Sequence, residues 1–88
     1  EDPMKIIYRP MFLRQYGKLP RGLQEEVREK IALFHSDQHH PFLKTHKLKG
    51  RLRGRWSFSV NYSYRIVFRF EGKGAAVLLA VGDHDVYK

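Results

Sequence analysis

The stretch that decides the fold is WSFSVNYSYRIVFRF, residues 56–70. Aromatic or branched apolar residues alternate with polar ones in both halves, and the halves meet at Asn61-Tyr62-Ser63. Because successive side chains of a strand point to opposite faces of a sheet, this period of two predicts two half-buried antiparallel strands joined by a tight turn. The segment therefore predicts a hairpin with one apolar face and one polar face.

Further strands are expected on both sides of this hairpin. Residues 71–74, EGKG, are typical of a second turn, and residues 75–81 are apolar at nearly every position, as in a central strand covered on both faces. Upstream, residues 50–54 are a basic loop punctuated by glycine, and residues 43–48 are another strand candidate. The C-terminal half thus predicts three or four sequential strands.

The N-terminal half follows a helical period. Residues 4–9 form a short strand-like run that stops at Pro10, a residue suited to the first turn of a helix. Apolar residues then recur at helical spacing in two groups, separated by a break at residues 19–22: Phe12, Tyr16 and Leu19, then Leu23, Val27, Ile31 and Phe34. The order predicts an α+β domain, β-α-α-β-β-β-β, with a helical hairpin on one face of an antiparallel sheet of four or five strands.

Length and composition limit the class of protein. The 88 residues, 42% hydrophobic, suffice for one core and not for two, so we expect one domain over residues 4–88; Glu1-Asp2-Pro3 resembles an expression-vector remnant. The absence of cysteine excludes disulfides and thiolate chemistry. No apolar run reaches the ~18 residues of a membrane span, and no signal-peptide pattern is present. These features predict a cytoplasmic protein without a membrane partner.

Charge is concentrated in one part of the chain. The net charge is +8, and no acidic residue occurs between Gln38 and Phe70. Eight cations fall in that stretch: Lys44, Lys47, Lys49, Arg51, Arg53, Arg55, Arg65 and Arg69. A basic stretch interleaved with aromatic residues is typical of a nucleic-acid surface, although the alternation also places most of these rings in a core. A polyanionic partner is therefore expected.

Four ordered segments carry a family resemblance: HKLKG (46–50), GRWS (54–57), YRIVF (64–68) and VGDHDVY (81–87). Together with the order of elements over residues 4–88, they resemble the RelE/ParE toxin superfamily of bacterial type II toxin–antitoxin modules. The resemblance implies a small basic toxin held inactive by a cognate acidic antitoxin protein. RelE-like branches cleave mRNA on the ribosome, beside its 16S rRNA, whereas ParE-like branches poison DNA gyrase and are not nucleases.

The nuclease branch needs a base for the 2′-hydroxyl, a cation for the phosphate and an acid for the 5′-oxygen. His46 is similar in position to a catalytic histidine of YafQ-like members, and His84 resembles the C-terminal active-site histidine of the YafQ and YoeB groups. Arg65 matches the family arginine that binds the scissile phosphate, and Tyr87 resembles the RelE-type tyrosine that contacts the substrate nucleotide. The resemblance implies a metal-independent endoribonuclease, without cofactor, that leaves a 2′,3′-cyclic phosphate.

The other basic residues of the stretch are expected to contact RNA phosphates. They are Lys44, Lys47, Lys49, Arg51, Arg53, Arg55 and Arg69. Ser57 and Ser59 depart from the family pattern, because RelE carries lysines and YafQ a histidine on this strand. Two alternatives therefore stay open: a ParE-like gyrase inhibitor, against which His84 argues, and an RNA-binding member without toxicity.

A metal site is not expected. His35 and His39 have the spacing of a metal-binding pair on a helix, but the second helix should end between them. No glutamate in a metalloprotease-like pattern accompanies them.

Overall fold

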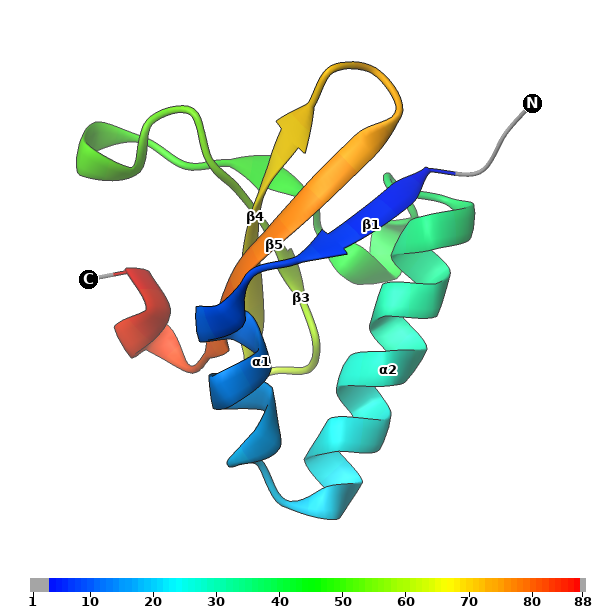
Figure 1. Cartoon of the computed structure of the whole chain (residues 1–88), viewed down its shortest axis with the longest axis vertical. Coiled ribbons are helices and arrows are strands. Elements are labelled where there is room, and N and C mark those ends of the chain that lie inside the picture. Colours follow the sequence, from blue (N-terminus) through cyan, green and yellow to red (C-terminus); the bar gives the residue numbers. More distant parts are fainter. Residues whose placement is uncertain (1–3, 88) are drawn as a thin grey trace.

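The computed structural model describes residues 4–87, so the expected vector remnant, residues 1–3, lies outside the described residues, as does residue 88 (Figure 1). The elements are β1 (Lys5–Tyr8), α1 (Pro10–Gly17), α2 (Arg21–Ser36), β2 (His46–Lys47), β3 (Trp56–Ser59), β4 (Arg65–Glu71) and β5 (Ala75–Gly82), with short 3-10 helices η1 (Pro41–Leu43), η2 (Gly50–Leu52) and η3 (His84–Tyr87). The predicted α+β class is confirmed. None of the helices within residues 4–87 has the length and apolar character needed to cross a membrane.

The five strands form one sheet in the order β1-β5-β4-β3-β2. The four C-terminal strands pair antiparallel with their neighbours, as predicted. Strand β1 instead runs parallel to β5, with Lys5 opposite Ala75 and Tyr8 opposite Leu78, so the sheet is mixed where an antiparallel one was expected. An apolar pattern determines the faces of a strand but not its direction, and β1 joins a partner that is distant in the sequence.

The turn between β3 and β4 forms where the alternation predicted it. The side-chain oxygen of Asn61 accepts hydrogen bonds from the backbone N–H groups of Ser63 and Tyr64, both at 2.8 Å. An asparagine side chain that bonds its own turn in this way stabilises the reversal of the chain. The register that follows places Trp56 opposite Phe68 and Ser59 opposite Arg65.

The strand expected over residues 43–48 is much shorter in the structure. Leu43 ends η1 and is buried, and Lys44 has a left-handed backbone with φ of 52°. A left-handed residue cannot continue a strand, so pairing begins only at His46. The basic loop that follows is built around Gly50 and Gly54, whose φ values of 68° and 90° favour glycine.

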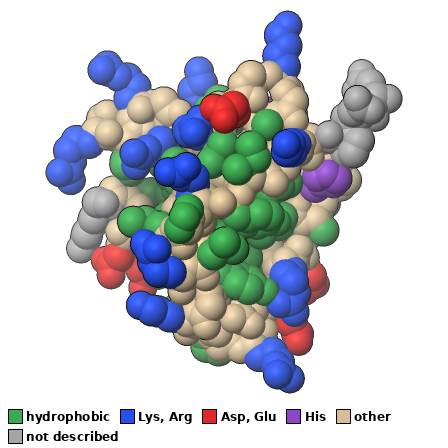
Figure 2. Space-filling model, viewed as in Figure 1, with side chains coloured by type: hydrophobic (Ala, Val, Ile, Leu, Met, Phe, Trp, Pro, Cys, Tyr) green, Lys and Arg blue, Asp and Glu red, His purple; other side chains and the backbone are tan. Residues whose placement is uncertain are grey.

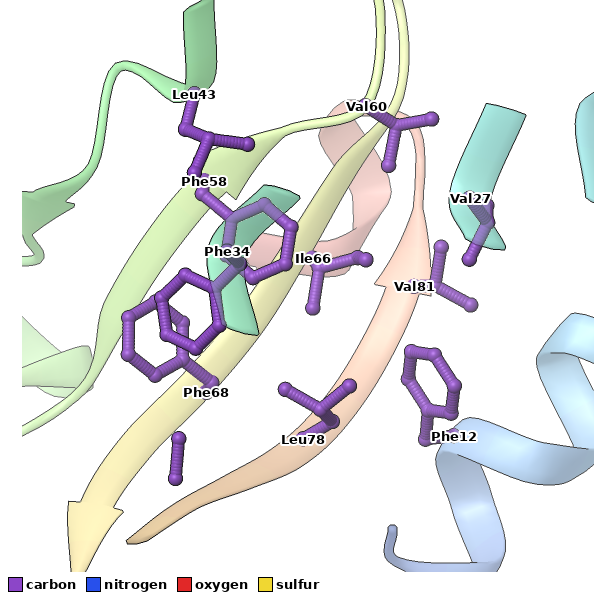
Figure 3. Packing of buried hydrophobic residues seen from close by; sticks show 11 residues of the cluster. Phe12, Val27, Phe34, Leu43, Phe58, Val60, Ile66, Phe68, Leu78 and Val81 are labelled. Carbon is purple, nitrogen blue, oxygen red and sulfur yellow. The ribbon is translucent and has the colours of Figure 1, made fainter. Parts of the chain in front are cut away.

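The two helices cover one face of the sheet, which we call the helix-covered face. Phe34 of α2 lies between Phe58 and Phe68, with ring centroids 4.6 and 4.8 Å apart (Figure 3). Phe12 of α1 points toward Leu78 and Val81 of β5 (Figure 3). The two predicted helical stripes therefore supply the core, as expected from their spacing.

The opposite side of the sheet, the outer face, carries Ser57, Ser59, Arg65, Val67, Ala80 and Gly82. In Figure 1, η3 (red) lies across the strands from α2 (cyan). Val67 lies on the outer face, yet it is only 2% exposed, because the outer face is also packed at this point. A bulge between Val67 and Phe68 shifts the register against β5. The outer face is thus partly covered near its middle and open at its ends.

Candidate active site on the outer face

Two rows of paired residues cross the outer face. The first row runs through His46, Ser57, Val67 and Ala80. The second runs through Ser59, Arg65 and Gly82, two residues further along each strand, or roughly 7 Å away. His84 follows Gly82 by two residues at the end of β5. The strand register therefore places His46 and Arg65 on one face, and His84 follows the strand that carries Gly82, the partner of Arg65.

Tyr87 connects η3 to the first row. Its hydroxyl shares a hydrogen bond of 2.9 Å with the Ser57 hydroxyl, and Ser57 is completely buried. The Tyr87 ring lies 6.5 Å from the His84 ring, centroid to centroid. The Ser57 hydroxyl thus anchors η3 over the sheet, and η3 places His84 and Tyr87 near each other.

Arg65 is half-buried and held by neutral oxygens. Its Nη1 atom donates to the Ser59 hydroxyl at 3.2 Å and to the backbone carbonyl of Asn61 at 3.1 Å. These partners orient the guanidinium without neutralising its charge, and the group keeps further N–H donors. A positive group oriented in this way is suited to bind a phosphate.

His46 is exposed, but its ring is oriented. Its Nδ1 atom lies 2.9 Å from the carbonyl oxygen of Lys44. Because a carbonyl oxygen can only accept, Nδ1 carries the hydrogen in this bond, and the Nε2 atom of the neutral ring keeps a lone pair. This is the tautomer that a base facing solvent requires.

Two pockets meet at the β3–β4 turn. Arg65 lines a pocket of about 470 Å³ together with Lys30, Lys44 and Phe42. His84 lines a second pocket of about 390 Å³ with Asp83 and Asp85. Tyr62, which is 95% exposed, lines both. The predicted phosphate ligand and the predicted catalytic histidine therefore lie on either side of one exposed aromatic ring.

Comparison with known proteins identifies the family. The family model of the ParE-like toxin domain matches residues 21–88. The chain belongs to the ParE-like toxin family. This match confirms the resemblance to the RelE/ParE superfamily that the ordered segments indicated. No curated protein sequence matches the toxin significantly.

Solved structures show the same fold at low sequence identity. The toxin is similar to a YoeB/ParE toxin from Agrobacterium tumefaciens, with a TM-score of 0.76, 21% identity, and coverage of 92% of this chain and 99% of the other. YafQ from E. coli gives a TM-score of 0.78 at 12% identity, covering 96% and 97%. The RelBE2 toxin–antitoxin complex from Mycobacterium tuberculosis gives 0.66 at 20% identity, covering 94% and 100%. The fold is therefore that of the RelE-like toxins.

The predicted RNA-binding cations of the toxin do not all gather at the site. Lys44 lines the Arg65 pocket, and Arg55 lines another pocket of the outer face, beside Val67. By contrast, the Lys47 amine lies 5.5 Å from the centre of the Trp56 ring, on the strand face opposite His46. The remaining loop cations are exposed around η2; they are Lys49, Arg51 and Arg53.

Arg69 lies apart from the site and is paired within the protein. Its guanidinium donates to the Glu71 carboxylate at 2.8 Å. The hydrogen bond and the charge of Arg69 hold the pKa of Glu71 below its ordinary value. An arginine already paired with a carboxylate is a poorer phosphate ligand than Arg65, so the structure gives Arg69 no place in the site.

Sequence reasoning missed Lys30 and Phe42. Lys30 lies in α2, outside the acid-free stretch, and its amine donates to the carbonyl of Val60 at 2.9 Å. Its spacing from Val27 and Phe34 puts it beside the buried stripe of the helix, an unusual place for a lysine and the one signal in the sequence that marks it. Phe42 adjoins a proline in a short connection and offers no such signal.

The histidine pair at the end of α2 is separated as expected. The helix ends at Ser36, between His35 and His39. Among residues 4–87 no group of three or more His, Asp or Glu side chains is placed to hold a metal ion.

Proposed function

We propose that this toxin is a metal-independent endoribonuclease that cleaves mRNA on the ribosome. The observation that supports the proposal is the strand register that places His46 and Arg65 on the outer face, together with η3, which carries His84 and Tyr87 and is held to that face by the hydrogen bond between Tyr87 and Ser57. A gyrase-binding surface would need no such arrangement of an oriented imidazole, an uncompensated guanidinium and a second imidazole.

The chemistry follows from these groups. The Nε2 atom of His46 takes the proton of the 2′-hydroxyl, and the 2′-oxygen forms a bond to phosphorus. Arg65 donates hydrogen bonds to the non-bridging oxygens, where negative charge develops. The bond between phosphorus and the 5′-oxygen breaks, and protonated His84 supplies the proton to that oxygen. The products are a 2′,3′-cyclic phosphate and a 5′-hydroxyl.

Tyr87 and Ser57 have a positioning role in this proposal. The Tyr87 ring offers a face on which a nucleotide base can stack, and its hydrogen bond to Ser57 sets the direction of that ring. Ser57 lies on the strand where RelE and YafQ carry basic residues, and here its hydroxyl holds η3 in place. Lys44 and Arg55 supply positive charge nearby.

The proposed partner outside the reaction is an acidic antitoxin. Structures similar to this toxin include complexes described as toxin–antitoxin RelBE2 from Mycobacterium tuberculosis and YoeB–YefM from Staphylococcus aureus. The net charge of +8 supports an acidic partner of this kind in the cytoplasm. Co-expression with the adjacent gene should yield a stable complex, and a basic or neutral neighbour that does not co-purify would contradict this part of the proposal.

Gyrase inhibition is the second candidate, because the matching family model is that of the ParE-like toxin domain. One experiment separates the two. The toxin is induced in a bacterium, new RNA 5′ ends are mapped by primer extension, and gyrase supercoiling is assayed in parallel. We expect new RNA 5′ ends in the induced cells. Cleavage of RNA by the purified toxin should persist in EDTA and should leave a cyclic phosphate on the upstream fragment. Inhibited supercoiling without new ends would favour the gyrase candidate.

The Arg65→Ala variant provides the matched test, with Arg21→Ala at the exposed start of α2 as control. Both variants should give the circular dichroism spectrum of the native fold, because Arg65 lies outside the core cluster. Only Arg65→Ala should abolish growth inhibition and RNA cleavage. Undiminished toxicity of a folded Arg65→Ala protein would remove Arg65 from the site.

A further inference from the structure

A cationic pocket lies at the end of the β3–β4 hairpin. Its three cations come from three different elements: Lys30 from α2, Lys44 from the end of η1 and Arg65 from β4. None of the described residues that line it is acidic. Positive charges from distant parts of the chain repel one another, so bringing them together is unfavourable unless an anion binds between them.

Two of the three cations, Lys30 and Arg65, are held in place by neutral groups. The Lys30 amine uses one of its three donors on the Val60 carbonyl, at 2.9 Å, and the lysine is half-buried. Arg65 is fixed by Ser59 and Asn61, as described above. The Glu26 carboxylate, which lies close by, accepts a hydrogen bond from the Asn61 side-chain amide at 3.2 Å. In the described part of the chain, Lys30 and Arg65 are therefore oriented by hydrogen bonds to uncharged oxygens, which leave their positive charges available to an anion.

Two large aromatic side chains flank the same pocket. Phe42 is 71% exposed and Tyr62 is 95% exposed, the two highest values among the exposed large hydrophobic residues of the described chain. Exposed rings beside a cationic pocket are what a single-stranded nucleic acid requires, since bases stack on the rings and phosphates bind the cations. An acidic peptide would use the cations and leave both rings without a purpose.

We infer that this pocket binds one nucleotide of a single-stranded RNA, next to the nucleotide that is cleaved. Its phosphate lies between Lys30 and Lys44, and its base stacks on Phe42 or Tyr62. The volume of about 470 Å³ is within the range of small-molecule sites, roughly 300–1,000 Å³. Tyr62 also lines the pocket of His84, so one strand can pass from the reacting centre into this pocket. The inference rests on the proposed function for its substrate.

The test measures binding without cleavage. A fluorescent hexanucleotide with 2′-O-methyl groups cannot supply the attacking hydroxyl, and its affinity for the toxin is read by anisotropy. The double variant Phe42→Ala/Tyr62→Ala should weaken binding about tenfold or more, because stacking is lost. The double variant Lys30→Gln/Lys44→Gln should weaken binding and reduce the steepness of its salt dependence. Tyr8→Ala, another partly exposed aromatic residue, and Lys73→Gln, in the β4–β5 turn, are controls that should bind as the wild type does.

Each outcome decides the inference. Both aromatic positions are exposed, so the double aromatic variant should keep its fold even if replacement of Lys30 disturbs α2. Hexanucleotide affinity within twofold of wild type in that folded variant would overturn the inference, whether or not the toxin cleaves RNA. Adenosine monophosphate that binds as tightly as the hexanucleotide would overturn it in favour of a free nucleotide, and equal competition by polyglutamate would overturn it in favour of an acidic protein. A wild-type toxin that binds in the expected pattern without cleaving RNA would support the pocket and refute only the nuclease.

Discussion

The two faces of strands β3 and β4 differ in the interactions that their side chains make. On the helix-covered face, Phe58, Ile66 and Phe68 are completely buried and pack with Phe34 into one aromatic core. On the outer face, between those positions, Ser57 and Arg65 make specific polar hydrogen bonds. Packing alone accounts for the first set. The second set lowers the apolar burial of the sheet, and its hydrogen bonds hold η3 and the β3–β4 turn in place.

Apolar and charged side chains are also separated on the molecular surface. Figure 2 shows apolar side chains gathered in the middle of the view, with lysine and arginine side chains around much of its edge. Met11 and Leu13 of α1 are among the exposed apolar residues of the chain. The toxin therefore keeps polar chemistry on the outer face of the sheet and leaves apolar groups exposed on α1.

The largest expected effect comes from breaking the helix-covered face. Phe34→Ala removes the ring that contacts both Phe58 and Phe68 and should lower the free energy of unfolding by about 3–5 kcal/mol. Since small domains have about 5–15 kcal/mol in total, much of the fold's stability would be lost. Urea denaturation followed by Trp56 fluorescence measures the effect. Phe42→Ala is the control, because its ring is exposed, and an equal loss there would contradict the assignment of the core.

On the outer face, His84→Gln should reduce catalysis and leave stability nearly unchanged. If His84 is the acid, the cleavage rate should fall by about 10²–10⁴-fold, measured on a defined mRNA with purified toxin. The wild-type rate should pass through a maximum with pH and fall on both sides, since one imidazole must be neutral and the other protonated. The variant should lose the alkaline limb, because that limb reports the acid. A rate within twofold of wild type would mean that His84 only shapes the turn after β5.

A smaller effect on stability is expected from the hydrogen bond between Tyr87 and the buried Ser57 on the outer face. Tyr87→Phe removes the partner of the buried Ser57 hydroxyl and should lower the free energy of unfolding by about 1–3 kcal/mol, since that hydroxyl then lacks a hydrogen bond. The double variant Tyr87→Phe/Ser57→Ala should recover most of the stability but not the activity. Thermal unfolding and cleavage assays of the three variants measure both quantities. Full activity in the double variant would show that the hydrogen bond has no positioning role.

The smallest effect concerns the Arg69–Glu71 pair at the exposed end of β4. Because Arg69 lowers the pKa of Glu71 from its ordinary value of 4.5, the pair stabilises the fold above that value, and the contribution disappears as the pH falls through the lowered pKa. Glu71→Gln should therefore reduce the denaturation midpoint slightly at neutral pH and not at all in strong acid. Both residues are partly exposed, so salt should weaken the difference. A loss that persists in strong acid would point to packing instead of charge.

Much of the fold could be predicted because its strands alternate. The period of two in residues 56–70 predicted β3, β4 and the turn at Asn61, and the helical spacing of Val27 and Phe34 predicted α2. The direction of β1 and the short length of β2 could not be predicted. The first depends on a pairing between distant segments, and the second on the left-handed backbone of Lys44.

The candidate site was predictable to the extent that its residues lie in ordered strands. Alternation placed Arg65 on the outer face, and the segment after β5 supplied His84, two residues beyond the Gly82 that pairs with Arg65. The roles of Ser57 and Lys30 were not predictable, because each makes a hydrogen bond across 30 positions of the sequence. The pairing of Arg69 with Glu71 was also missed, since counting cations takes no account of a carboxylate two residues away.

The parallel pairing of β1 with β5 has a consequence for synthesis of the toxin. Lys5 is made well before its partner Ala75, and all residues between them must be made before the edge of the sheet can close. Contacts that join such distant segments form slowly, because the entropy of closing the loop precedes any gain in contacts. His84 and Tyr87 follow β5 and enter the structure at the same late stage. A ribosome making this toxin therefore carries a chain whose sheet is incomplete until β5 has emerged.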